Sequence, residues 1–409
     1  MRLVIAGGGF AGFWAAAAAA RLRRDVPVLA SLEILLISRD DRLVIRPRLY
    51  EPDPSSLAVP LNPRLDTIAV EFRRGEIESI DTARKEIRLS SASVVPYDKL
   101  VLATGSHVDR PFGALGTHGF DIDTLAGASA LDRHLHELAS QASSEGCWTA
   151  VIAGAGFTGI ELATALPQRL RAIAGRSASI RVILVDKAER VGYSLGDGPN
   201  PAIQAALAAA EIETRTGVTI ADADLAGVTL STGERIACGT LVWTTGMRAS
   251  PLAAKISTQL DAIGRIAVTP ELRVLGLTDV FAAGDVAHAA ADEGHSSLQS
   301  CQHAQMTGRF AGYNAAADLG GLPAQPYRQP LYTTCLDLGE SGAVLTTGWD
   351  RIVEATGQHA KAVKRRINTE LIYPPAEADA IMAAAIPMVL DQEAFRSRIL
   401  QVNSKTNPA

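Results

Sequence analysis

The chain has few cysteines and no secretory signal. Its 409 residues include only Cys147, Cys238, Cys301 and Cys335, and no two of these form a CxxC pair. Such sparse spacing excludes the disulfide framework of small secreted proteins and is typical of a reducing compartment. The first residues enter a strand pattern without a basic segment and an apolar segment ahead of a cleavage site. We therefore expect a cytoplasmic protein.

Long hydrophobic runs and an excess of positive charge are also missing. The apolar stretch from Trp14 to Ala20 is followed by arginines and falls well short of the roughly 20 residues that a bilayer requires. Near the C-terminus, AIMAAAIPMVL is short and is broken by Pro387, so it is either a packed helix or a segment resting on a membrane surface. The formal net charge is −5, which excludes a broad basic surface for nucleic acid.

One glycine-rich motif occurs twice, about 147 residues apart. Each copy lies between a short apolar run, typical of a buried strand, and a helix-favouring segment. In this context the first glycine permits a tight turn, the second lets the backbone approach a pyrophosphate, and the third lets helix and strand pack closely. The motif therefore predicts an α/β fold with two dinucleotide sites, whereas the alternative is two turns that only pack helices on sheets. The glycines are Gly7, Gly9 and Gly12 in the first copy, and Gly154, Gly156 and Gly159 in the second.

The end of the second strand of each copy is where such folds contact the adenosine ribose. In the second copy the segment IRVILVDKAER places Asp186 there, and a carboxylate repels a 2′-phosphate, so NADH is favoured over NADPH. Lys187 and Arg190 lie close enough to leave NADPH open. In the first copy Ser38 takes this position, where its hydroxyl can bond a ribose hydroxyl, and Arg39 could cover the adenine.

Three further segments carry a family resemblance. They are YDKLVLATGS (97–106), GTLVWTTGMRASPL (239–252) and LTDVFAAGDVAH (277–288). With the two glycine motifs, they make the chain similar, over about residues 1–325, to type II NADH dehydrogenases and their relatives in the pyridine nucleotide-disulfide oxidoreductase superfamily. The resemblance implies two Rossmann-like domains, the NAD-binding one inserted in the FAD-binding one, and a small C-terminal α+β domain. The implied bounds are 1–112 and 247–324 for the FAD-binding domain, 113–246 for the NAD-binding domain and 325–409 for the C-terminal domain.

The resemblance also implies the cofactors and their contacts. FAD would lie in the first glycine loop and NADH in the second, so that hydride passes from the nicotinamide to the flavin. The implied FAD contacts are Gly7, Gly9, Phe10, Ala11, Gly12, Ser38, Arg39, Pro47, Arg48, Ile77, Ala103, Thr104, Gly105, Gly284, Asp285, Cys301, Gln302 and Ala304. The implied NADH contacts are Gly154, Gly156, Phe157, Thr158, Gly159, Asp186, Thr245 and Gly246.

Glu161 is the candidate catalytic residue. Similar enzymes carry a glutamate two residues after the last glycine of the second motif, near the nicotinamide and the flavin. A carboxylate in a half-buried cleft can relay protons or restrain the nicotinamide. The alternative is a first-turn glutamate that is favoured by the helix dipole.

The electron acceptor is predicted to be a small molecule, a quinone or a quinone-like compound. No cysteine pair follows the first ribose position, which excludes disulfide reduction by that route. The segment SCQHAQMTGRFAGYN keeps Gln302 and Ala304 of the AQxAxQQ-like motif that borders the quinone in type II NADH dehydrogenases, but it has Cys301, Met306 and Thr307 at the other positions. The quinone motif is therefore only partly retained.

Two arginines also depart from the family pattern. The segment IRPRLYE keeps Pro47, Leu49 and Tyr50 but places Arg46 and Arg48 around them. These side chains would either favour an anionic or carbonyl-bearing acceptor, or pair with a phosphate or a nearby acid.

Two other functions remain as alternatives. Cys301 or Cys335 could attack sulfur beside the flavin, as in a sulfide- or thiol-oxidising flavoprotein, although lone cysteines are commonly small buried hydrophobes. The chain could also be a redox-sensing NADH- and FAD-binding protein. The resemblance implies dimer or membrane contacts for the C-terminal region, so a homodimer and peripheral attachment to the inner face of the membrane stay open. No metal site is expected, because His134 and His136 point apart on a helix.

The C-terminal unit is predicted to contain strands and a polar helix. LYTTCLDLG and GAVLTTGW, separated by a turn, favour two strands. Lys361, Lys364 and Arg365 share one helical face, which we expect to be solvated.

Overall fold

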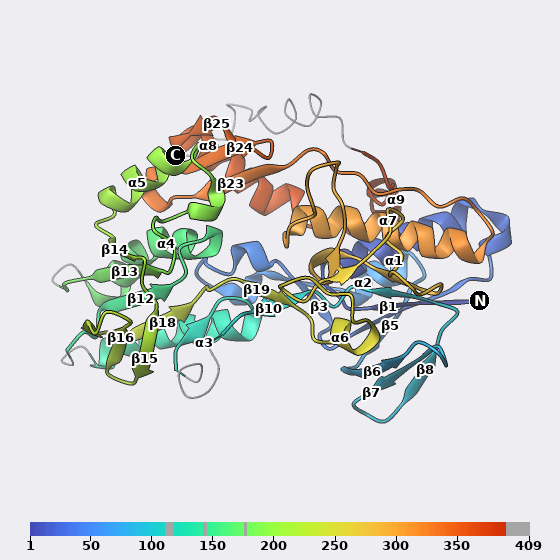
Figure 1. Cartoon of the computed structure of the whole chain (residues 1–409), viewed down its shortest axis with the longest axis horizontal. Coiled ribbons are helices and arrows are strands. Elements are labelled where there is room, and N and C mark those ends of the chain that lie inside the picture. Colours follow the sequence, from blue (N-terminus) through green and yellow to red (C-terminus); the bar gives the residue numbers. More distant parts are fainter. Residues whose placement is uncertain (111–117, 142–144, 176–177, 390–409) are drawn as a thin grey trace.

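The computed structural model describes residues 1–110, 118–141, 145–175 and 178–389. The domain boundary expected at 112–113 and the end of the C-terminal unit lie outside these residues. Two five-stranded parallel sheets form the two halves of the molecule (Figure 1). The first has the order β21-β9-β1-β2-β5, and the second has the order β11-β18-β12-β13-β14.

The first sheet combines strands from the start of the chain with one strand from far downstream. It consists of β1 (Arg2–Ala6), β2 (Glu33–Ser38), β5 (Glu71–Arg74), β9 (Lys99–Leu102) and β21 (Val280–Ala282). The second sheet consists of β11 (Phe120–Asp121), β12 (Thr149–Ala153), β13 (Arg181–Asp186), β14 (Glu213–Thr216) and β18 (Thr240–Trp243). β1 and β12 lie at the centre of their sheets and are buried, which explains why their sequences are continuous apolar runs. The predicted α/β class with parallel sheets is confirmed.

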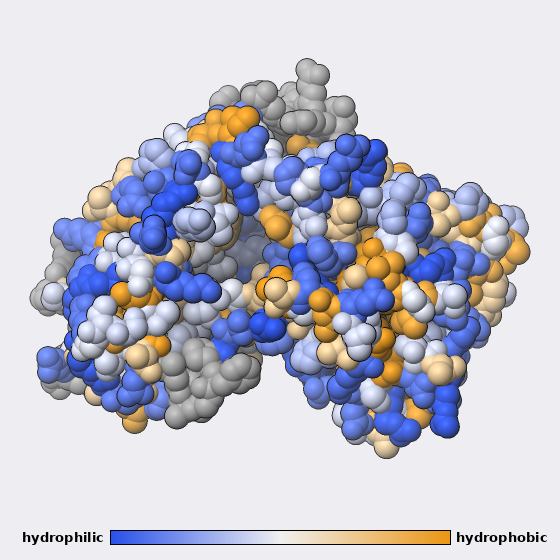
Figure 2. Space-filling view, viewed as in Figure 1, coloured by the Kyte–Doolittle hydropathy of each residue, from blue (hydrophilic) through white to orange (hydrophobic). Residues whose placement is uncertain are grey.

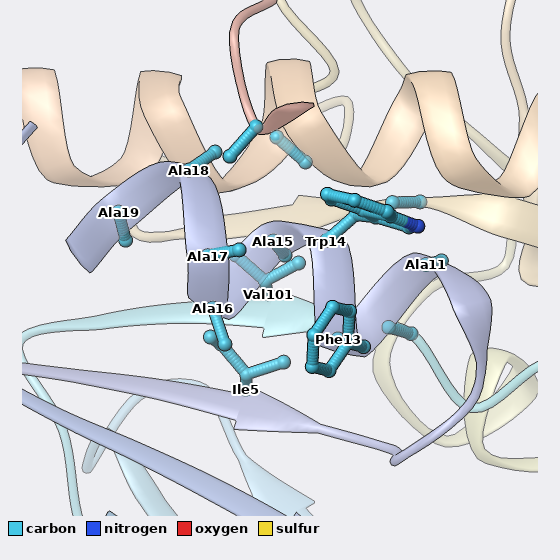
Figure 3. Close-up of a cluster of buried hydrophobic side chains, with 14 of the residues drawn as sticks. Ile5, Ala11, Phe13, Trp14, Ala15, Ala16, Ala17, Ala18, Ala19 and Val101 are labelled. Carbon is cyan, nitrogen blue, oxygen red and sulfur yellow. The ribbon is translucent and has the colours of Figure 1, made fainter. Parts of the chain in front are cut away.

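Helix α1 (Phe10–Asp25) packs between the first sheet and helix α7 (Cys301–Leu319). Figure 3 shows Phe13 and Ala16 on the side of α1 that meets Ile5 and Val101, and Trp14 on the side of α7. A Cβ atom on Gly312 would lie 2.0 Å from the carbonyl oxygen of Ala15, so the two helices touch through their backbones. The alanine run is therefore a buried core helix. Within the described residues, no helix has both the length and the apolar character to cross a membrane.

The remaining helices cover the sheets and connect their strands. They are α2 (Asn62–Thr67), α3 (Leu125–Glu137), α4 (Phe157–Ala174), α5 (Asn200–Ala209) and α6 (Leu252–Ile256). Short helical turns span Pro27–Leu29, Arg46–Arg48, Pro54–Ser56, Leu138–Gln141, Tyr193–Leu195, Gly284–Val286 and Gly339–Ser341.

Smaller sheets of two or three strands, most of them antiparallel, extend from both halves. One consists of β6 (Ile77–Asp81), β7 (Glu86–Leu89) and β8 (Val94–Pro96), and another of β15 (Ile220–Asp224), β16 (Gly227–Leu230) and β17 (Arg235–Ala237). β3 (Arg42–Val44) pairs antiparallel with β4 (Ala58–Pro60), and β20 (Ile266–Ala267) pairs with β22 (Ala287–His288) in parallel.

The chain crosses between the two halves twice, side by side. β10 (Ser106–Val108) follows the first sheet's strand β9, and β19 (Met247–Ala249) follows the second sheet's strand β18. These two crossing strands pair antiparallel in the middle of the molecule (Figure 1).

The C-terminal unit begins with the predicted strands. β23 (Thr333–Asp337), β24 (Ala343–Thr347) and β25 (Ile352–Thr356) form an antiparallel sheet against which α8 (Gly357–Arg366) packs. This sheet lies beside α4 and α5 in Figure 1. A π-helical turn (Ile367–Leu371) and α9 (Ala378–Ala384) follow. Ile381 and Met382 of α9 are buried in the core around α1, so this part of AIMAAAIPMVL is a packed helix.

Candidate active site

The two glycine loops have the same backbone construction. Gly9 caps the N-terminus of α1 and Gly156 caps that of α4. The backbone N–H of Gly7 donates to Ile37 O at 2.8 Å, and that of Gly154 donates to Val185 O at the same distance. Each loop thus joins the central strand to the helix that follows it, and one hydrogen bond ties the loop to the second strand.

Two glycines in each loop are required by packing. A Cβ atom on Gly12 would lie 1.8 Å from the carbonyl oxygen of Gly7, and a Cβ on Gly159 would lie 1.8 Å from that of Gly154. The first glycines also lack room, because a Cβ on Gly7 would lie 2.2 Å from Ala103 O and a Cβ on Gly154 would lie 2.4 Å from Thr244 O.

The middle glycine of each loop faces open space instead. No protein atom lies within 4 Å of a Cβ placed on Gly9 or on Gly156. Two buried polar atoms on the first half, Thr104 Oγ1 and Gln302 Nε2, have no hydrogen-bond partner among the described residues. Open backbone at a helix N-terminus, with unpaired polar groups in the same half, fits a dinucleotide pyrophosphate and a polar ring system.

The residues expected to meet the adenosine riboses lie at the ends of the second strands. Ser38 ends β2, and a Cβ on Gly8 would come 2.7 Å from its hydroxyl, so Ser38 borders the first loop. Asp186 ends β13, and its two carboxylate oxygens accept from the backbone N–H groups of Ala155 and Ala188, at 2.5 and 2.7 Å. Asp186 is thereby held beside the second loop.

The other predicted cofactor contacts follow neighbouring strands. Ala103, Thr104 and Gly105 come directly after β9, while Thr245 and Gly246 follow the equivalent strand β18. Phe10 and Ala11 begin α1, and Phe157 and Thr158 begin α4. Ile77 is set apart, since it begins β6, pairs with Leu89 and packs against the core below the first sheet.

Asp285 lies in a polar cluster between the two halves. The hydroxyl of Ser106 donates to its carboxylate at 2.6 Å, and the Arg46 guanidinium lies 3.4 Å away. Arg46 also forms an ion pair with Asp123, which precedes α3 in the second half. Burial alone would lower the pKa of Arg46, but Asp123 and Asp285 raise it above its ordinary value.

Both arginines of IRPRLYE pair with acids. Arg48 makes a two-pronged contact with Glu51, at 2.9 and 2.7 Å, and also donates to the hydroxyl of Tyr373 at 2.8 Å. Arg46 is paired to Asp123 and Asp285. The contacts of both arginines therefore support pairing with nearby acids rather than recognition of the acceptor.

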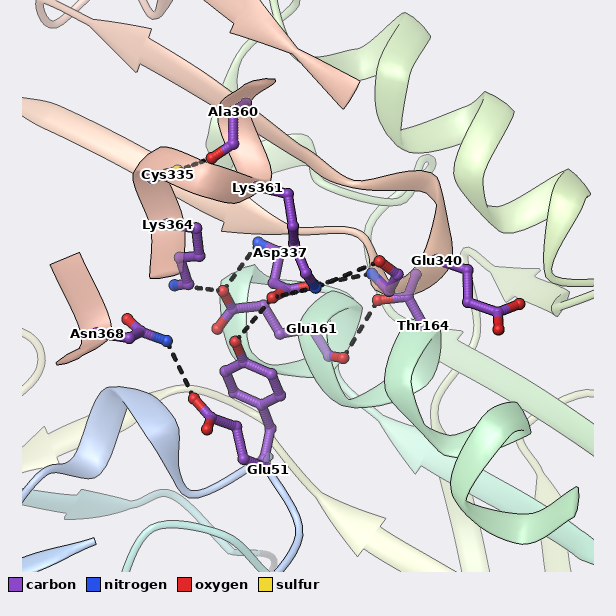
Figure 4. A network of polar contacts seen from close by, with 12 residues as sticks. Glu51, Glu161, Thr164, Cys335, Asp337, Glu340, Ala360, Lys361, Lys364 and Asn368 are labelled. Atoms are coloured by element: carbon purple, nitrogen blue, oxygen red, sulfur yellow. Dashed lines mark hydrogen bonds and ion pairs between the residues drawn. The ribbon is translucent and has the colours of Figure 1, made fainter. Parts of the chain in front are cut away.

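Glu161 is buried and paired with a lysine. Figure 4 shows its side chain between α4 and the C-terminal unit, facing Lys364 of α8. One carboxylate oxygen lies 2.7 Å from Lys364 Nζ and accepts from the Asp337 backbone N–H at 3.0 Å. Burial raises the pKa of Glu161 to about 7, against the opposing effect of Lys364. These contacts differ from those of a solvated glutamate at a helix start.

The solvated face predicted for Lys361, Lys364 and Arg365 is wrong for Lys364. Its side chain is 7% exposed and lies 5.4 Å above the ring of Phe157. Burial works against its charge, but Glu161 raises the pKa of Lys364 above the ordinary value. The reason is tertiary: α8 presents this residue to a carboxylate that lies about 200 positions earlier in the chain, which helical spacing does not reveal.

A second polar group surrounds Glu161. Lys361 contacts both carboxylate oxygens of Asp337, at 2.5 and 2.7 Å, and the hydroxyl of Tyr50 donates to Asp337 Oδ2 at 3.1 Å. Tyr50 is buried, and burial together with Glu161 and Asp337 raises its pKa far above the ordinary value. The sequence pattern contained Tyr50, but gave no sign of Asp337, Lys361 or Lys364 as site residues.

The N-terminus of α7 carries the residues that resemble the quinone motif. Gln302 Oε1 accepts from the Thr333 backbone N–H at 3.4 Å, and Ala304 lies beside Gly284. Thr307, which departs from that motif, accepts from the Gly284 backbone N–H at 2.9 Å and so fixes the turn before Asp285. The threonine that replaces the motif's glutamine thus stabilises the backbone next to Asp285.

The thiols of the two candidate cysteines are poorly suited to attack sulfur. Burial raises the pKa of Cys301 to about 11 and that of Cys335 to about 12. Both remain protonated at neutral pH, whereas the thiolate is the nucleophile. The Lys364 charge acts on both thiols, which places them around the same lysine as Glu161.

The molecule is hollowed between its two halves. Figure 2 shows a broad recess on this face between the half that carries the second sheet and the half that carries the first. Among the described residues, no group of three or more His, Cys, Asp or Glu side chains could hold a metal ion. The candidate site thus combines two glycine loops of the same construction with the buried Glu161–Lys364 pair.

Curated proteins of known name are similar to this chain over most of its length. Curated relatives include an NADH dehydrogenase-like protein of Mycobacterium tuberculosis, 44% identical over 95% of this chain and 98% of the relative. A demethylphylloquinone reductase of Synechocystis is 29% identical over 84% of this chain and 86% of the relative.

The fold also matches solved structures. The sulfide:quinone oxidoreductase of Aquifex aeolicus superposes with a TM-score of 0.74, over 100% of this chain and 96% of the other, at 20% sequence identity. That likeness concerns the fold alone. The pyridine nucleotide-disulphide oxidoreductase family model matches residues 1–308. The chain is therefore an oxidoreductase that belongs to the pyridine nucleotide-disulphide oxidoreductase family.

Proposed function

We propose that the protein oxidises NADH through a bound FAD and passes the electrons to a quinone or a quinone-like acceptor. The observation that carries this proposal is the buried Glu161–Lys364 pair, two residues beyond the second nucleotide loop. A carboxyl whose pKa burial raises to about 7 is suited to hold and release a proton at neutral pH. The names of the relatives, an NADH dehydrogenase-like protein and a demethylphylloquinone reductase, support the proposal.

The residues divide the work between two cofactors. Gly9 and the N-terminus of α1 would hold the FAD pyrophosphate, and Gly156 and the N-terminus of α4 would hold that of NADH. Bound flavin supplies the capacity to accept a hydride and to pass electrons onward. Asp285, held by Ser106 and Arg46, would accept from the flavin's ribitol or lie near its pyrophosphate.

Proton supply distinguishes a quinone from acceptors that take up electrons alone. NADH delivers a hydride, which contains two electrons and one proton, whereas reduction of a quinone to its quinol consumes two electrons and two protons. One proton per turnover must therefore come from water. Glu161 would donate it as a general acid while Lys364 holds the carboxyl in place, so turnover requires the protonated form that prevails below about pH 7.

The proposed function also bears on the choice between NADH and NADPH and on where the enzyme acts in the cell. Asp186 at the end of β13 would favour NADH, while Lys187 and Arg190 leave NADPH as a second donor. A lipid-borne quinone would bring the enzyme to the inner face of the membrane, whereas a diffusible acceptor would leave it in the cytoplasm. Sedimentation with lipid vesicles would separate these two cases, and chromatography with light scattering would show whether the chain forms a homodimer.

The test is anaerobic reduction with NADH, followed by a panel of acceptors while the flavin absorbance is recorded. We expect purified protein to be yellow, to bleach with NADH and to regain its colour rapidly with a quinone. Protein that stays colourless in excess FAD would overturn the proposal. Flavin reduction by sulfide would support the sulfur-oxidising alternative, and slow turnover with a large NADH-induced change in association would support the redox sensor.

A further inference from the structure

The proton that a quinone requires must reach a buried group. The side chain of Glu161 is 3% exposed, and its immediate partner Lys364 is 7% exposed. Neither group can exchange protons freely with bulk water in this arrangement. If Glu161 gives up a proton in each turnover, as the proposed function requires, another group must replace it.

A chain of polar contacts leads from the Glu161 region to the surface. The Tyr50 hydroxyl donates to Asp337, and Asp337 contacts Lys361 through both of its oxygens. The side chain of Lys361 is 28% exposed, so it meets solvent. Lys364 Nζ lies 5.9 Å from the centre of the Tyr50 ring and 2.7 Å from Glu161, so Tyr50 and Glu161 flank the same ammonium group. Figure 4 shows Lys361, Asp337 and Glu161 in succession.

Other groups around Glu161 do not make such a route. Glu51 contacts Arg48 and Asn368, and these contacts lead away from the hydroxyl of Tyr50. Cys335 is buried and donates its thiol to the Ala360 carbonyl oxygen, so it offers no path to solvent. Lys361 is therefore the solvent-facing cation of the network among the described residues.

We propose that Lys361, Asp337 and Tyr50 form a proton route that recharges Glu161 from solvent, an inference that rests on the proposed function. Asp337 takes a proton from the Lys361 ammonium, and water restores that proton to the lysine. The Asp337 acid gives a proton to the Tyr50 oxygen as Tyr50 turns its own hydroxyl proton toward Glu161. No electron moves along the route. After one proton has passed, Lys361 is again an ammonium, Asp337 a carboxylate and Tyr50 a neutral phenol. Glu161 is protonated, as it was before the turnover.

The test compares a quinone with ferricyanide, which accepts electrons without protons. In Tyr50→Phe and Asp337→Asn, we expect NADH:quinone turnover to fall on the order of tenfold to a hundredfold, with a larger solvent deuterium isotope effect. Ferricyanide turnover and anaerobic flavin reduction by NADH should stay within about twofold of wild type, because neither consumes a proton from this route.

A conservative variant separates proton transfer from structure. Lys361→Arg keeps the ion pair with Asp337, but a guanidinium does not release its proton near neutral pH. It should therefore lose quinone turnover as Lys361→Gln does, whereas a purely structural lysine would be rescued by arginine. The matched controls are Arg365→Gln on α8 and Glu340→Gln beside β23, which change exposed charges outside the route.

The outcomes separate this inference from the proposed function. Wild-type protein that reduces ferricyanide with NADH but no quinone would remove the proposed function and the route with it. Wild-type protein that reduces quinone, alongside variants that all match it, would overturn the route alone. A parallel fall of quinone and ferricyanide turnover would also overturn the route, because it would show a structural effect.

Discussion

The two glycine loops share a backbone and differ in what covers the helix that follows. Gly12 and Gly159 are packed identically, each against the carbonyl oxygen of the first glycine in its loop. Two residues later, the first helix carries Trp14 and the second carries Glu161, and both are buried. The same local geometry therefore presents an aromatic ring in one half and a carboxyl in the other.

The difference arises from the neighbouring elements. Trp14 faces α7, where the Arg309 guanidinium lies 4.2 Å from its ring. Glu161 faces the C-terminal unit, which supplies Lys364 and the Asp337 backbone N–H. The comparison teaches that the glycine motif fixes the loop and the start of the helix, while the covering element decides whether the side chain two residues later stacks on a guanidinium or joins a buried ion pair.

Substitution of the packing glycine should affect both halves most strongly. In Gly12→Ala or Gly159→Ala, the new Cβ would clash with a backbone oxygen that cannot move without displacing the strand. We expect each to lower the free energy of unfolding by about 3 kcal/mol or more. Chemical denaturation of the apoprotein measures this, and near-wild-type stability of either variant would contradict the close packing described for that loop.

Loss of the buried carboxyl should affect the second half alone. We expect Glu161→Gln to lower NADH:quinone turnover on the order of a hundredfold. Because burial raises the pKa of Glu161 to about 7, wild-type turnover should fall as the pH rises above 7 and the acid form is lost. A pH profile of turnover checks both statements. An inflection near pH 7 that persists in the glutamine variant would assign it to another group.

Alanine at each open glycine should weaken the binding of one ligand and not the other, without lowering the stability of the fold. Gly9 and Gly156 have φ values of −79° and −81°, which alanine adopts readily, and neither has a protein atom near its Cβ position. Gly9→Ala should reduce the FAD content. Gly156→Ala should retain FAD but weaken NADH binding by about tenfold, equivalent to about 1.4 kcal/mol. Titration and flavin absorbance measure these effects, and the opposite pairing of ligands with loops would refute the assignment.

A smaller effect is expected at the end of the second strand. Asp186→Ser makes the second half resemble the first, where Ser38 occupies the equivalent position. Removal of the carboxylate should reduce the preference for NADH over NADPH by about tenfold, because repulsion of the 2′-phosphate is lost. Steady-state kinetics with both nucleotides tests this, and an unchanged preference would shift attention to Lys187 and Arg190.

The smallest effect is expected from the cysteines. Cys301→Ser and Cys335→Ser should each keep NADH:quinone turnover within about twofold, because burial keeps both thiols protonated at neutral pH. Loss of turnover in both variants would instead revive the sulfur-oxidising alternative.

The sequence predicted the regular parts of the molecule well. The apolar runs before Gly7 and Gly154 are the central parallel strands, and the C-terminal strands lie where their pattern indicated. These elements depend on local patterns of hydrophobic residues and glycine. The cofactor contacts and the domain bounds remain predictions that the experiments above address.

The partners of the buried charges could not be predicted. Lys364 belongs to a helix whose basic residues resemble a solvated surface, and its carboxylate partner lies in α4. Arg46 likewise joins Asp123 and Asp285, which are distant in the chain. Such pairs form only when separate elements come together, so neither spacing nor composition contains a signal for them.

The paired crossing strands β10 and β19 limit how the two nucleotide cradles can move. Because both links run side by side and pair with each other, neither half can shift without disturbing this ladder, and Leu49 and Tyr50 of the first half also pack in the core of the second. Arg46 forms an ion pair with an acid from each half and so links the two halves beside these strands. In the proposed function, these contacts between the halves would set how far the nicotinamide lies from the flavin.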